Sequence, residues 1–491
     1  MHKIKKIITC VMFVSLLFTT PFSVLADESE VNITIEQTNE NAVFSAYKIL
    51  NATNSGEKYA YTLNEKYAPI IKEVTGLTEE VDIIDYISKL DADGIRSFAD
   101  NVYAKIVENE TTAEGVSIDS KFANMEQGYY LIAETTIGEQ PDSASLIMLD
   151  TLGEENIIVK TKEDVPSLEK KVQEINDSTN TTVWQDGADF DIGDSVNFQL
   201  TSDLPSNYYA YKNYSYIIHD TLSSGLSYNN DAKVYVVNGT ERTDLSDFAN
   251  FTPKNGDTIT ITFDDLKAIE NITINADSKF VVEYSATLNE NAKIGSEGNP
   301  NVANLEFTNN PYDEGTGETP DDKVIVFTYE SIVNKVDKEG LSLEGAGFTL
   351  YKFDADVNDY VAVGTEIIGE GMTTFNFVGL DAGQYKLVET TVPAGYNKAD
   401  DIIFTITAEY DTNAAEPKFI DLKVNDDATA MFSIDKDAGT LETDVTNISG
   451  TQLPETGGIG TTLFYLVGGL LVAGTSVVLI TRKRMSNNVE E

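Results

Sequence analysis

The chain has 491 residues and carries 34 Lys and Arg against 81 Asp and Glu, which gives a formal net charge of −47. So large an acidic excess leaves no basic surface for phosphate groups, which excludes a nucleic-acid-binding protein. With 41% hydrophobic residues, the chain can bury several cores, and a prior of roughly 150 residues per domain suggests about three domains. The one cysteine, Cys10, lies in a segment that we expect to be removed, so disulfides and cysteine metal sites are not expected in the mature chain.

The first 26 residues have the parts of a secretory signal. Lys3, Lys5 and Lys6 precede an apolar run, which ends in the sequence SVLA at Ala26. We therefore expect cleavage after Ala26. A lipid-modified cysteine is disfavoured because Cys10 comes before most of the apolar run rather than after it.

Residues 453–491 contain a second targeting segment. A pentapeptide precedes the uncharged stretch 461–480, long enough for a transmembrane helix of about 20 residues, and a basic tail follows it. The pentapeptide consists of Leu453, Pro454, Glu455, Thr456 and Gly457. This order resembles the cell-wall sorting signal of Gram-positive surface proteins. The resemblance implies that a sortase cuts between Thr456 and Gly457 and anchors the secreted chain to the cell wall, whereas a plain single-pass anchor would not need the pentapeptide.

Between the two ends, short alternating segments such as FVVEYSATL and DTITITF are separated by Gly, Asn, Asp and Pro. This pattern predicts an all-β fold of tandem Ig-like β-sandwich domains. One region departs from it, because its apolar residues follow a helical period. The predicted helices contain Ile83, Ile84, Ile87 and Leu90 in the first, and Ile95, Phe98, Ala99, Val102 and Ile106 in the second.

Two sequence motifs occur twice. FSAYK at 44–48 matches FTLYK at 348–352, and GYYLIAET at 128–135 matches GQYKLVET at 383–390. Two copies of one module are therefore expected, with the helices inserted in the first. The predicted division is a signal peptide at 1–26, an N-terminal domain at 27–163, a larger middle β domain at 164–329, a third domain at 330–452 and the sorting signal at 453–491.

Three polar residues of the third domain, Lys335, Glu389 and Asn447, share strand parity with apolar or aromatic neighbours. If that parity faces the core, an amine, a carboxyl and an amide are buried together. Desolvation lowers the pKa of a lysine and raises that of a carboxyl, so both can be neutral. A neutral amine can then attack the amide, expel ammonia and leave an isopeptide bond.

The segments KVDKEG, GAGFTLYK and YKLVETTVPAGY resemble the CnaB-type domain of Gram-positive adhesins and pilins. The resemblance implies an isopeptide bond between Lys335 and Asn447, promoted by Glu389 as the catalytic acid. A core ion pair or solvated charges are the alternative.

The middle domain follows the same logic. Lys170, Asp220 and Asn309 alternate with apolar residues, whereas Asn304 faces away by parity. The stretch from VPSLEKKVQE to KVIVFTYE resembles the CnaA-like middle domain of sortase-assembled shaft pilins, in which an Asp replaces the Glu. The resemblance implies a bond between Lys170 and Asn309, promoted by Asp220. The alternatives left open are Lys171 for the lysine and Asp191 for the acid.

The N-terminal domain, CnaB-like by its repeat, differs at the reacting positions. Glu134 matches Glu389, but the position equivalent to Lys335 is Val31, and residues 27–47 contain no lysine. No isopeptide bond is therefore expected in this domain, and Glu134 is left with at most a structural role.

In shaft pilins, a lysine near the junction of the first two domains, often in a YPKN-like motif, attacks the thioester of the next subunit. Aligning V-Y-P-K with residues 159–162 places Lys162 at the acceptor, with Lys160 as the alternative. The Tyr and Pro of the motif are absent here, and two exposed linker lysines are the competing interpretation.

The resemblance covers nearly the whole chain and implies the backbone subunit of a covalent, sortase-assembled pilus. Implied partners are a class C-type pilus sortase, a housekeeping sortase, identical subunits, ancillary pilins and peptidoglycan; no cofactor or metal is expected, and no host ligand is indicated. A wall-anchored monomeric adhesin or an ancillary pilin is the main alternative. A secreted enzyme is disfavoured, because outside the signal peptide His219 is the only histidine and no nucleophile elbow or HExxH motif is found.

Overall fold

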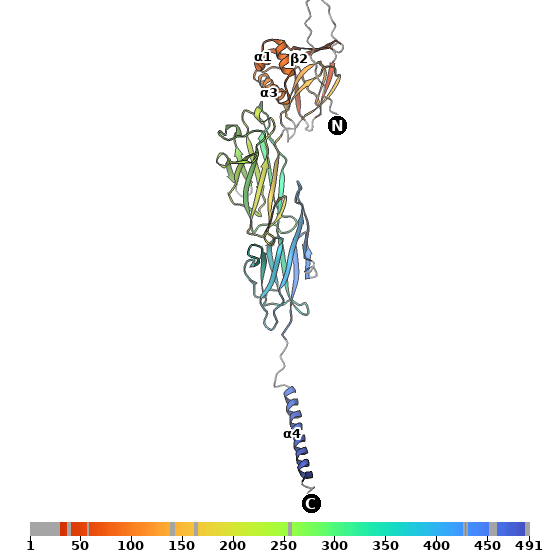
Figure 1. Cartoon of the computed structure of the whole chain (residues 1–491), viewed down its shortest axis with the longest axis vertical. Coiled ribbons are helices and arrows are strands. Elements are labelled where there is room, and N and C mark those ends of the chain that lie inside the picture. Colours follow the sequence, from red (N-terminus) through yellow and green to blue (C-terminus); the bar gives the residue numbers. More distant parts are fainter. Residues whose placement is uncertain are drawn as a thin grey trace, which may run out of the picture. The chain divides into compact units, whose positions relative to one another are not determined.

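The structure is a computed structural model that describes residues 30–36, 41–55, 58–137, 143–161, 165–253, 258–425, 428, 431–450 and 459–486 (Figure 1). The predicted signal peptide, the sorting pentapeptide 453–457 and Lys162 lie outside these residues. The described chain is mostly β-structure, as predicted. It forms two compact units: unit 1 comprises Met1–Val172, Asn197–Ala286 and Pro300–Val324, and unit 2 comprises Gln173–Val196, Thr287–Asn299 and Ile325–Glu491. The division into three domains stays a prediction.

The first part of unit 1 contains two sheets around a shared apolar core. One sheet has the order β5-β1-β8, with bounds Lys121–Glu126, Glu30–Glu36 and Asn156–Lys160. The other has the order β3-β2-β6-β7, with bounds Lys58–Leu63, Val43–Ser55, Gly128–Thr136 and Leu146–Asp150, and the short β4, Gly115–Val116, pairs with β2. Apolar side chains from β1, β2, β5 and β6 fill the space between them: Val31, Ile33, Phe44, Phe122 and Ile132.

Three helices follow β3 and lie beside β2 (Figure 1): α1 (Ala68–Thr75), α2 (Glu80–Ser88) and α3 (Ala92–Glu108). The two helices predicted from periodicity correspond to α2 and α3. Asp91 caps α3, because its side chain accepts a hydrogen bond from the backbone N–H of Gly94 at 2.9 Å. The predicted apolar stripe of α3 is buried, with Phe98, Ala99, Val102 and Ile106 facing the core.

The rest of unit 1 contains two further sheets. The first has the order β9-β12-β19-β15-β16, with bounds Leu168–Asn176, Ser195–Ser202, Lys279–Leu288, Lys233–Asn238 and Glu241–Asp244; β14 (Leu226–Tyr228) pairs with β19. The second has the order β22-β20-β13-β18-β17, with bounds Asp322–Phe327, Asn299–Thr308, Tyr216–Leu222, Thr258–Phe263 and Asn250–Pro253; β21 (Thr316–Glu318) pairs with β20. Short 3-10 turns occupy Tyr208–Ala210, Ser246–Phe248 and Leu266–Ala268. Burial alternates along β12, β13 and β20, as the alternating sequence predicts.

Unit 2 contains a four-stranded and a larger sheet around one core. The four-stranded sheet has the order β27-β23-β32-β31, with bounds Thr374–Leu380, Tyr329–Asp337, Thr440–Asn447 and Phe432–Asp435. The larger sheet has the order β25-β24-β28-β29-β30, with bounds Asp359–Ala362, Gly347–Asp354, Gly383–Thr391, Ile402–Tyr410 and Phe419–Val424, and β26 (Ile367–Ile368) pairs with β24. The short strands β10 (Thr181–Gln185) and β11 (Gly187–Asp189) pair with β9 and β22.

The sequence repeat corresponds to a repeat in strand pairing. In the first copy, β2 pairs antiparallel with β6 and places Phe44 opposite Glu134. In the second, β24 pairs antiparallel with β28 and places Phe348 opposite Glu389. Each pairing shifts register just before its Phe. The first and last strands of each copy also pair in parallel, β1 with β8 and β23 with β32.

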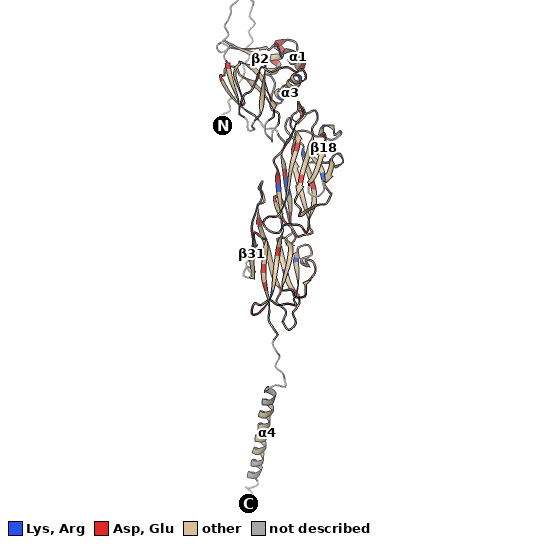
Figure 2. Cartoon of the chain, turned by 180° about the vertical axis from the view of Figure 1, so that it is seen from behind, with Lys and Arg blue, Asp and Glu red and all other residues tan. Residues whose placement is uncertain are grey.

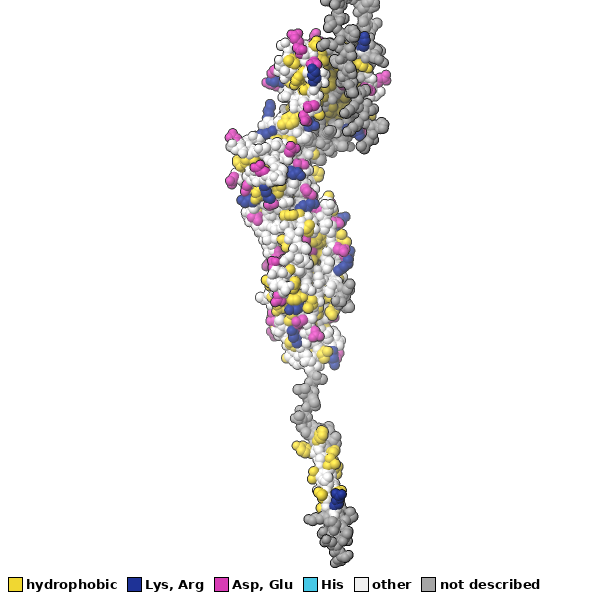
Figure 3. Space-filling view, viewed as in Figure 1, with side chains coloured by type: hydrophobic (Ala, Val, Ile, Leu, Met, Phe, Trp, Pro, Cys, Tyr) yellow, Lys and Arg dark blue, Asp and Glu magenta, His cyan; other side chains and the backbone are white. Residues whose placement is uncertain are grey.

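Helix α4 (Ile459–Ser486) contains the apolar stretch 461–480, and its described side chains are exposed and largely hydrophobic (Figure 3). Among the described residues, no helix combines the length and the apolar character needed to cross a membrane. The predicted transmembrane role of 461–480 therefore stays a prediction. Asp and Glu are spread over the strands of both units, with fewer Lys and Arg among them (Figure 2).

Candidate functional site

In unit 2, the three residues predicted to react lie together in the core. Lys335 on β23 is fully buried, and Glu389 on β28 and Asn447 on β32 are almost as inaccessible. β23 and β32 are parallel neighbours, with Lys335 opposite Val445 and Asp337 opposite Asn447. Strand parity therefore points the amine and the amide into the core from adjacent strands, as the sequence predicted.

Short contacts orient this group. The Asn447 Nδ2 donates to Glu389 Oε1 at 2.8 Å, and the backbone N–H of Ala399 donates to Glu389 Oε2 at 2.7 Å. The Lys335 Nζ donates to the carbonyl oxygen of Val445 at 2.6 Å. Burial lowers the pKa of Lys335, although Glu389 acts in the opposite direction. The arrangement favours a neutral amine beside an amide that is already hydrogen-bonded to an acid.

A second buried lysine lies in the middle part of unit 1. The Lys170 Nζ lies 2.6 Å from Asp220 Oδ2 and 3.0 Å from the hydroxyl of Tyr284. The rings of Phe198 and Tyr284 flank the amine, which lies 5.5 and 5.3 Å from their centroids. Burial lowers the pKa of Lys170, and the nearby Asp220 only partly offsets this effect.

The structure distinguishes between the alternatives left open by the sequence in this cluster. Lys170 is buried, whereas Lys171 is partly exposed and forms an ion pair with Glu169 at 3.2 Å. Asp220 contacts Lys170, whereas Asp191 contacts a different lysine, Lys352.

The predicted amide partner, Asn309, is wrong in its position along the strand. Asp220 lies opposite Ala303 in the pairing of β13 with β20. Asn309 follows Ala303 by six residues, beyond the end of β20, and at about 3.3 Å per residue lies roughly 20 Å away along the strand. Its backbone N–H and carbonyl instead bond Gly315 and Ala144. Parity selected the correct face of β20, but parity carries no information about axial position.

The amide that the structure brings to this cluster belongs to Asn301. It is fully buried, faces the same side of β20 as Ala303, and donates through Nδ2 to the hydroxyl of Tyr284 at 2.6 Å. Lys170, Asp220 and Asn301 therefore all contact one phenolic oxygen. The sequence signal for Asn301 was its parity, which it shares with Asn309.

The N-terminal copy of the module lacks both reacting partners. Val31 is buried in the core, and the parallel register of β1 with β8 places Ile157 where Asn447 stands in the other copy. Glu134 is buried, and its Oε2 accepts a hydrogen bond from the backbone N–H of Ser145 at 3.2 Å. This part of unit 1 offers no lysine–amide pair at the equivalent positions.

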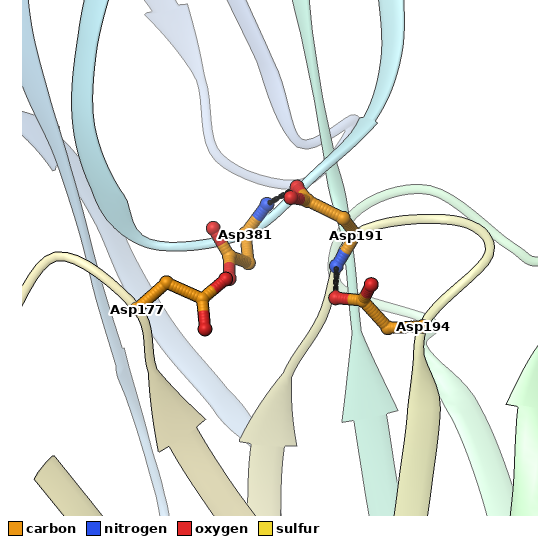
Figure 4. Close-up of side chains that lie close together, drawn as sticks. All are labelled: Asp177, Asp191, Asp194 and Asp381. Carbon is orange, nitrogen blue, oxygen red and sulfur yellow. Dashed lines mark hydrogen bonds between the residues drawn. The ribbon is translucent and has the colours of Figure 1, made fainter. Parts of the chain in front are cut away.

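A third buried lysine, Lys352 in unit 2, has a different environment that the sequence did not reveal. Its Nζ lies 2.9 Å from Asp177, 2.9 Å from Asp191 and 2.7 Å from Asp381. Carboxylate oxygens of Asp177, Asp191, Asp194 and Asp381 lie within 4.8 Å of one another, close enough to surround a cation (Figure 4). The Lys352 ammonium already supplies positive charge there. Burial would lower the pKa of Lys352, but Asp381 and Asp191 outweigh burial and raise it, so this lysine stays charged and is not a nucleophile.

Two carboxyls near Lys352, Asp194 inside this cluster and Glu174 outside it, predict a pH-dependent stability of unit 2. Burial, and then the charge of Asp189, raises the pKa of Glu174, and burial with Asp191 raises that of Asp194 to about 6. The folded state therefore holds protons that the unfolded chain has already released. The free energy of unfolding should rise as the pH falls from 8 through about 6, until the unfolded carboxyls protonate near about pH 4.

The measurement is the melting temperature of the secreted body, residues 27–452, at pH 8 and at pH 5.5. We expect the lower pH to raise it by roughly 5 °C. Glu174→Gln is the matched variant, because a Gln oxygen can still accept the bonds from the Asp189 N–H and the Tyr410 hydroxyl, 2.9 and 3.1 Å from the Glu174 oxygen. This variant should show a weaker pH dependence. Equal pH profiles for the two proteins would contradict the prediction.

Of the two acceptor lysines, the structure describes Lys160 alone. It ends β8, its side chain is 80% exposed, and it forms an ion pair with Glu36 at 2.8 Å. Lys162 and residues 453–457 lie outside the described residues, so the geometry does not choose between the two lysines.

Comparisons with known proteins agree with this architecture. Residues 192–311 match the family described as "Gram-positive pilin backbone subunit 2, Cna-B-like domain", residues 330–418 match a prealbumin-like fold domain, and residues 446–487 match the LPXTG cell wall anchor motif. The chain is 27% identical over 396 residues to the trypsin-resistant surface T6 protein of Streptococcus pyogenes serotype M6, covering 66% of this chain and 70% of that protein.

One solved structure shows the same fold, and a second has a lower TM-score. The T6 backbone pilin of serotype M6 Streptococcus pyogenes has a TM-score of 0.52 at 17% identity and covers 86% of this chain and 99% of that one. The pilus 2b backbone protein of group B streptococcus has a TM-score of 0.40 at 23% identity and covers 58% of this chain and 99% of that one. The family matches, taken with the sorting signal, show a secreted, cell-wall-anchored surface protein that contains a domain of the Gram-positive pilin backbone family and a prealbumin-like domain.

Proposed function

We propose that this chain is the repeating shaft subunit of a covalent pilus and that two internal isopeptide bonds stabilise it. The observation that carries the proposal is the pair of buried clusters in which a lysine of lowered pKa lies beside an acid and an amide. The proposed bonds join Lys335 to Asn447, with Glu389 as the acid, and Lys170 to Asn301, with Asp220 as the acid. Each forms once, within the protein, and releases one ammonia.

The placement of each bond suits a fibre under tension. In unit 2, the bond would join β23 to β32, the first and last strands of its sandwich. In the middle part of unit 1, it would join β9 of one sheet to β20 of the other. A chain without cysteine in its secreted body gains from such a cross-link the constraint on the unfolded state that a disulfide would give. The relative from Streptococcus pyogenes is named trypsin-resistant, and we infer the same resistance here.

The three-domain division is part of this proposal. The T6 backbone pilin is described as having a modular three-domain structure. The boundaries 27–163, 164–329 and 330–452 separate the two copies of the repeated module from the middle pair of sheets. A cell-wall-anchored monomeric adhesin or ancillary pilin remains the second candidate function, because it would share the anchor and the sandwiches.

Polymerisation separates the two functions. A class C-type pilus sortase would join Thr456 of one subunit to Lys162 of the next, with Lys160 as the alternative acceptor, and a housekeeping sortase would attach the fibre to peptidoglycan. The test is co-expression of the full chain with a pilus sortase, followed by electrophoresis in hot detergent. The wild-type chain should give a ladder of covalent multimers, and Lys162→Ala should reduce it to monomer.

The control variants make the result specific. Thr456→Ala should abolish the ladder, because it destroys the pentapeptide that the sortase recognises and no thioester forms at residue 456. Lys160→Ala should leave the ladder intact. Loss of the ladder in Lys160→Ala alone would move the acceptor to Lys160. A ladder that persists when both lysines are replaced would overturn the acceptor assignment, and no ladder from the wild-type chain with an active pilus sortase would favour the monomeric adhesin.

A further inference from the structure

The two buried clusters differ in how the acid reaches the amide. In unit 2, Glu389 Oε1 contacts Asn447 Nδ2 directly at 2.8 Å. In unit 1, Asp220 has a side chain one methylene shorter, and no hydrogen bond joins it to Asn301, although both residues are described. The second acidic oxygen, Asp220 Oδ1, and the amide oxygen, Asn301 Oδ1, are both buried without a hydrogen-bond partner in this part of the structure.

Tyr284 fills the gap between the acid and the amide. Its hydroxyl donates to Asp220 Oδ2 at 2.7 Å, and it accepts from Asn301 Nδ2 at 2.6 Å and from Lys170 Nζ at 3.0 Å. One donor hydrogen and two lone pairs are the full capacity of a phenol, so every position is used. The hydroxyl therefore touches all three groups that the reaction requires.

We propose that Tyr284 is a catalytic residue of this middle site and that it relays the hydrogen bond of Asp220 to the amide of Asn301. This inference rests on the proposed function, because it requires the bond between Lys170 and Asn301. Turning the amide by 180° exchanges its oxygen and nitrogen at little steric cost, since the two atoms are nearly the same size. The Lys170 ammonium passes one proton to Asp220 along their 2.6 Å contact, the carbonyl oxygen accepts from Tyr284, and Asp220 donates to the phenolic oxygen.

The relay polarises the carbonyl at the moment when charge develops on it. Neutral Lys170 attacks Cγ of Asn301 and forms the C–N bond. The carbonyl oxygen takes a proton from the Tyr284 hydroxyl, and Asp220 gives its own proton to Tyr284. When the bond from Cγ to Nδ2 breaks, the departing group takes the proton lost by the Lys170 amine and leaves as ammonia. The protons lent by Tyr284 and Asp220 return, so the net change is one amide formed and one ammonia released.

The surroundings of Tyr284 suit this role. It lies on β19, and its ring stacks on Phe198 with centroids 5.3 Å apart, which fixes the hydroxyl between the two sheets. Burial, and then the charge of Asp220, raises the pKa of Tyr284 well above its usual value, so the hydroxyl keeps its proton. Because the ring packing does not depend on the hydroxyl, phenylalanine can replace Tyr284 with little change in the core.

The test measures bond formation by denatured intact mass and by recovery of the cross-linked peptides after proteolysis. Residues 27–452 are purified soon after a short expression pulse, and the fraction of each cross-link is followed over time at pH 5, 7 and 9. Tyr284→Phe should form the Lys170–Asn301 bond at least 10-fold more slowly than the wild-type protein at pH 7. The Lys335–Asn447 bond of the same molecules lies in unit 2 and should form at the wild-type rate, which makes it the internal control of each sample.

Two further variants distinguish catalysis from packing. The ring centroid of Tyr228 lies 5.7 Å from that of Tyr284. Tyr228→Phe removes this neighbouring hydroxyl and should leave the formation of both isopeptide bonds unaffected. Adding Asp220→Glu to Tyr284→Phe lengthens the acid by one methylene, so that it can contact Asn301 directly, as Glu389 contacts Asn447. The double variant should form the Lys170–Asn301 bond at a restored rate, with a shifted pH profile. A structural role would not be rescued in this way.

The outcomes of the two proposals are separable. If the wild-type chain never forms the bond at Lys170, the proposed function fails at this site. If the wild-type chain forms it and Tyr284→Phe forms it equally fast across the pH range, the relay is refuted while the bond stands.

Discussion

Replacing Lys335 by alanine is expected to lower the melting temperature of the 330–452 region by roughly 20 °C. The proposed bond to Asn447 closes a loop of about 100 residues, and a cross-link of that span stabilises the folded state by about 4.7 kcal/mol in the chain-entropy model. Each kcal/mol corresponds to roughly 4 °C for a domain of this size. The measurement is differential scanning calorimetry of residues 27–452, with trypsin digestion as a second readout.

The controls separate the covalent bond from ordinary packing. Lys338 lies in the same region and is exposed, and among the described ion pairs it pairs only with Glu339. Lys338→Ala should therefore leave the melting temperature unchanged. Asn447→Ala should cost about as much as Lys335→Ala, and the double variant little more, because either change removes the same bond. Full additivity of the two single changes would contradict the cross-link.

The second large effect distinguishes Asn301 from Asn309 in the middle site. Asn301→Ala should abolish the bond to Lys170, and its denatured mass should then show the loss of one ammonia, about 17 Da, in place of two. Asn309→Ala should still show the loss of two, because Asn309 lies beyond the end of β20. If Asn309 is the partner of Lys170 instead, the two variants should show the reverse pattern, which would contradict the assignment of Asn301.

Stability should follow the same division. Asn301→Ala removes a cross-link between two sheets and should make the middle region sensitive to trypsin, whereas Asn309→Ala should retain the wild-type resistance. A cross-linked peptide containing Lys170 and Asn301, identified by fragmentation after digestion, would give the connectivity directly.

Strand parity and the internal repeat made much of this fold predictable from the sequence. The repeated motifs predicted two copies of one module, and the structure places Phe44 opposite Glu134 in the first copy and Phe348 opposite Glu389 in the second. Alternation likewise identified Lys335 as a core residue, since a polar residue flanked at i−2 by buried apolar ones shares their face.

Other features depended on information that local patterns do not contain. Helix α1 was missed because it is short and begins at Ala68 with a proline in its first turn, which reads as a break. Asn309 was chosen over Asn304 by parity, and Asn301 was not considered, because parity fixes the face of a strand but not the position along it relative to a distant partner. The carboxylates around Lys352 come from segments far apart in the chain, so only the folded structure shows that they meet.

The most direct test of the account is the intact mass of wild-type residues 27–452 under denaturing conditions, where only covalent bonds survive. Two internal isopeptide bonds predict a mass about 34 Da below that calculated from the sequence, and Lys352, which remains charged, should add no third loss. A mass equal to the calculated value would show that both lysine clusters are buried ion pairs, and it would contradict the covalent cross-links at the centre of the proposal.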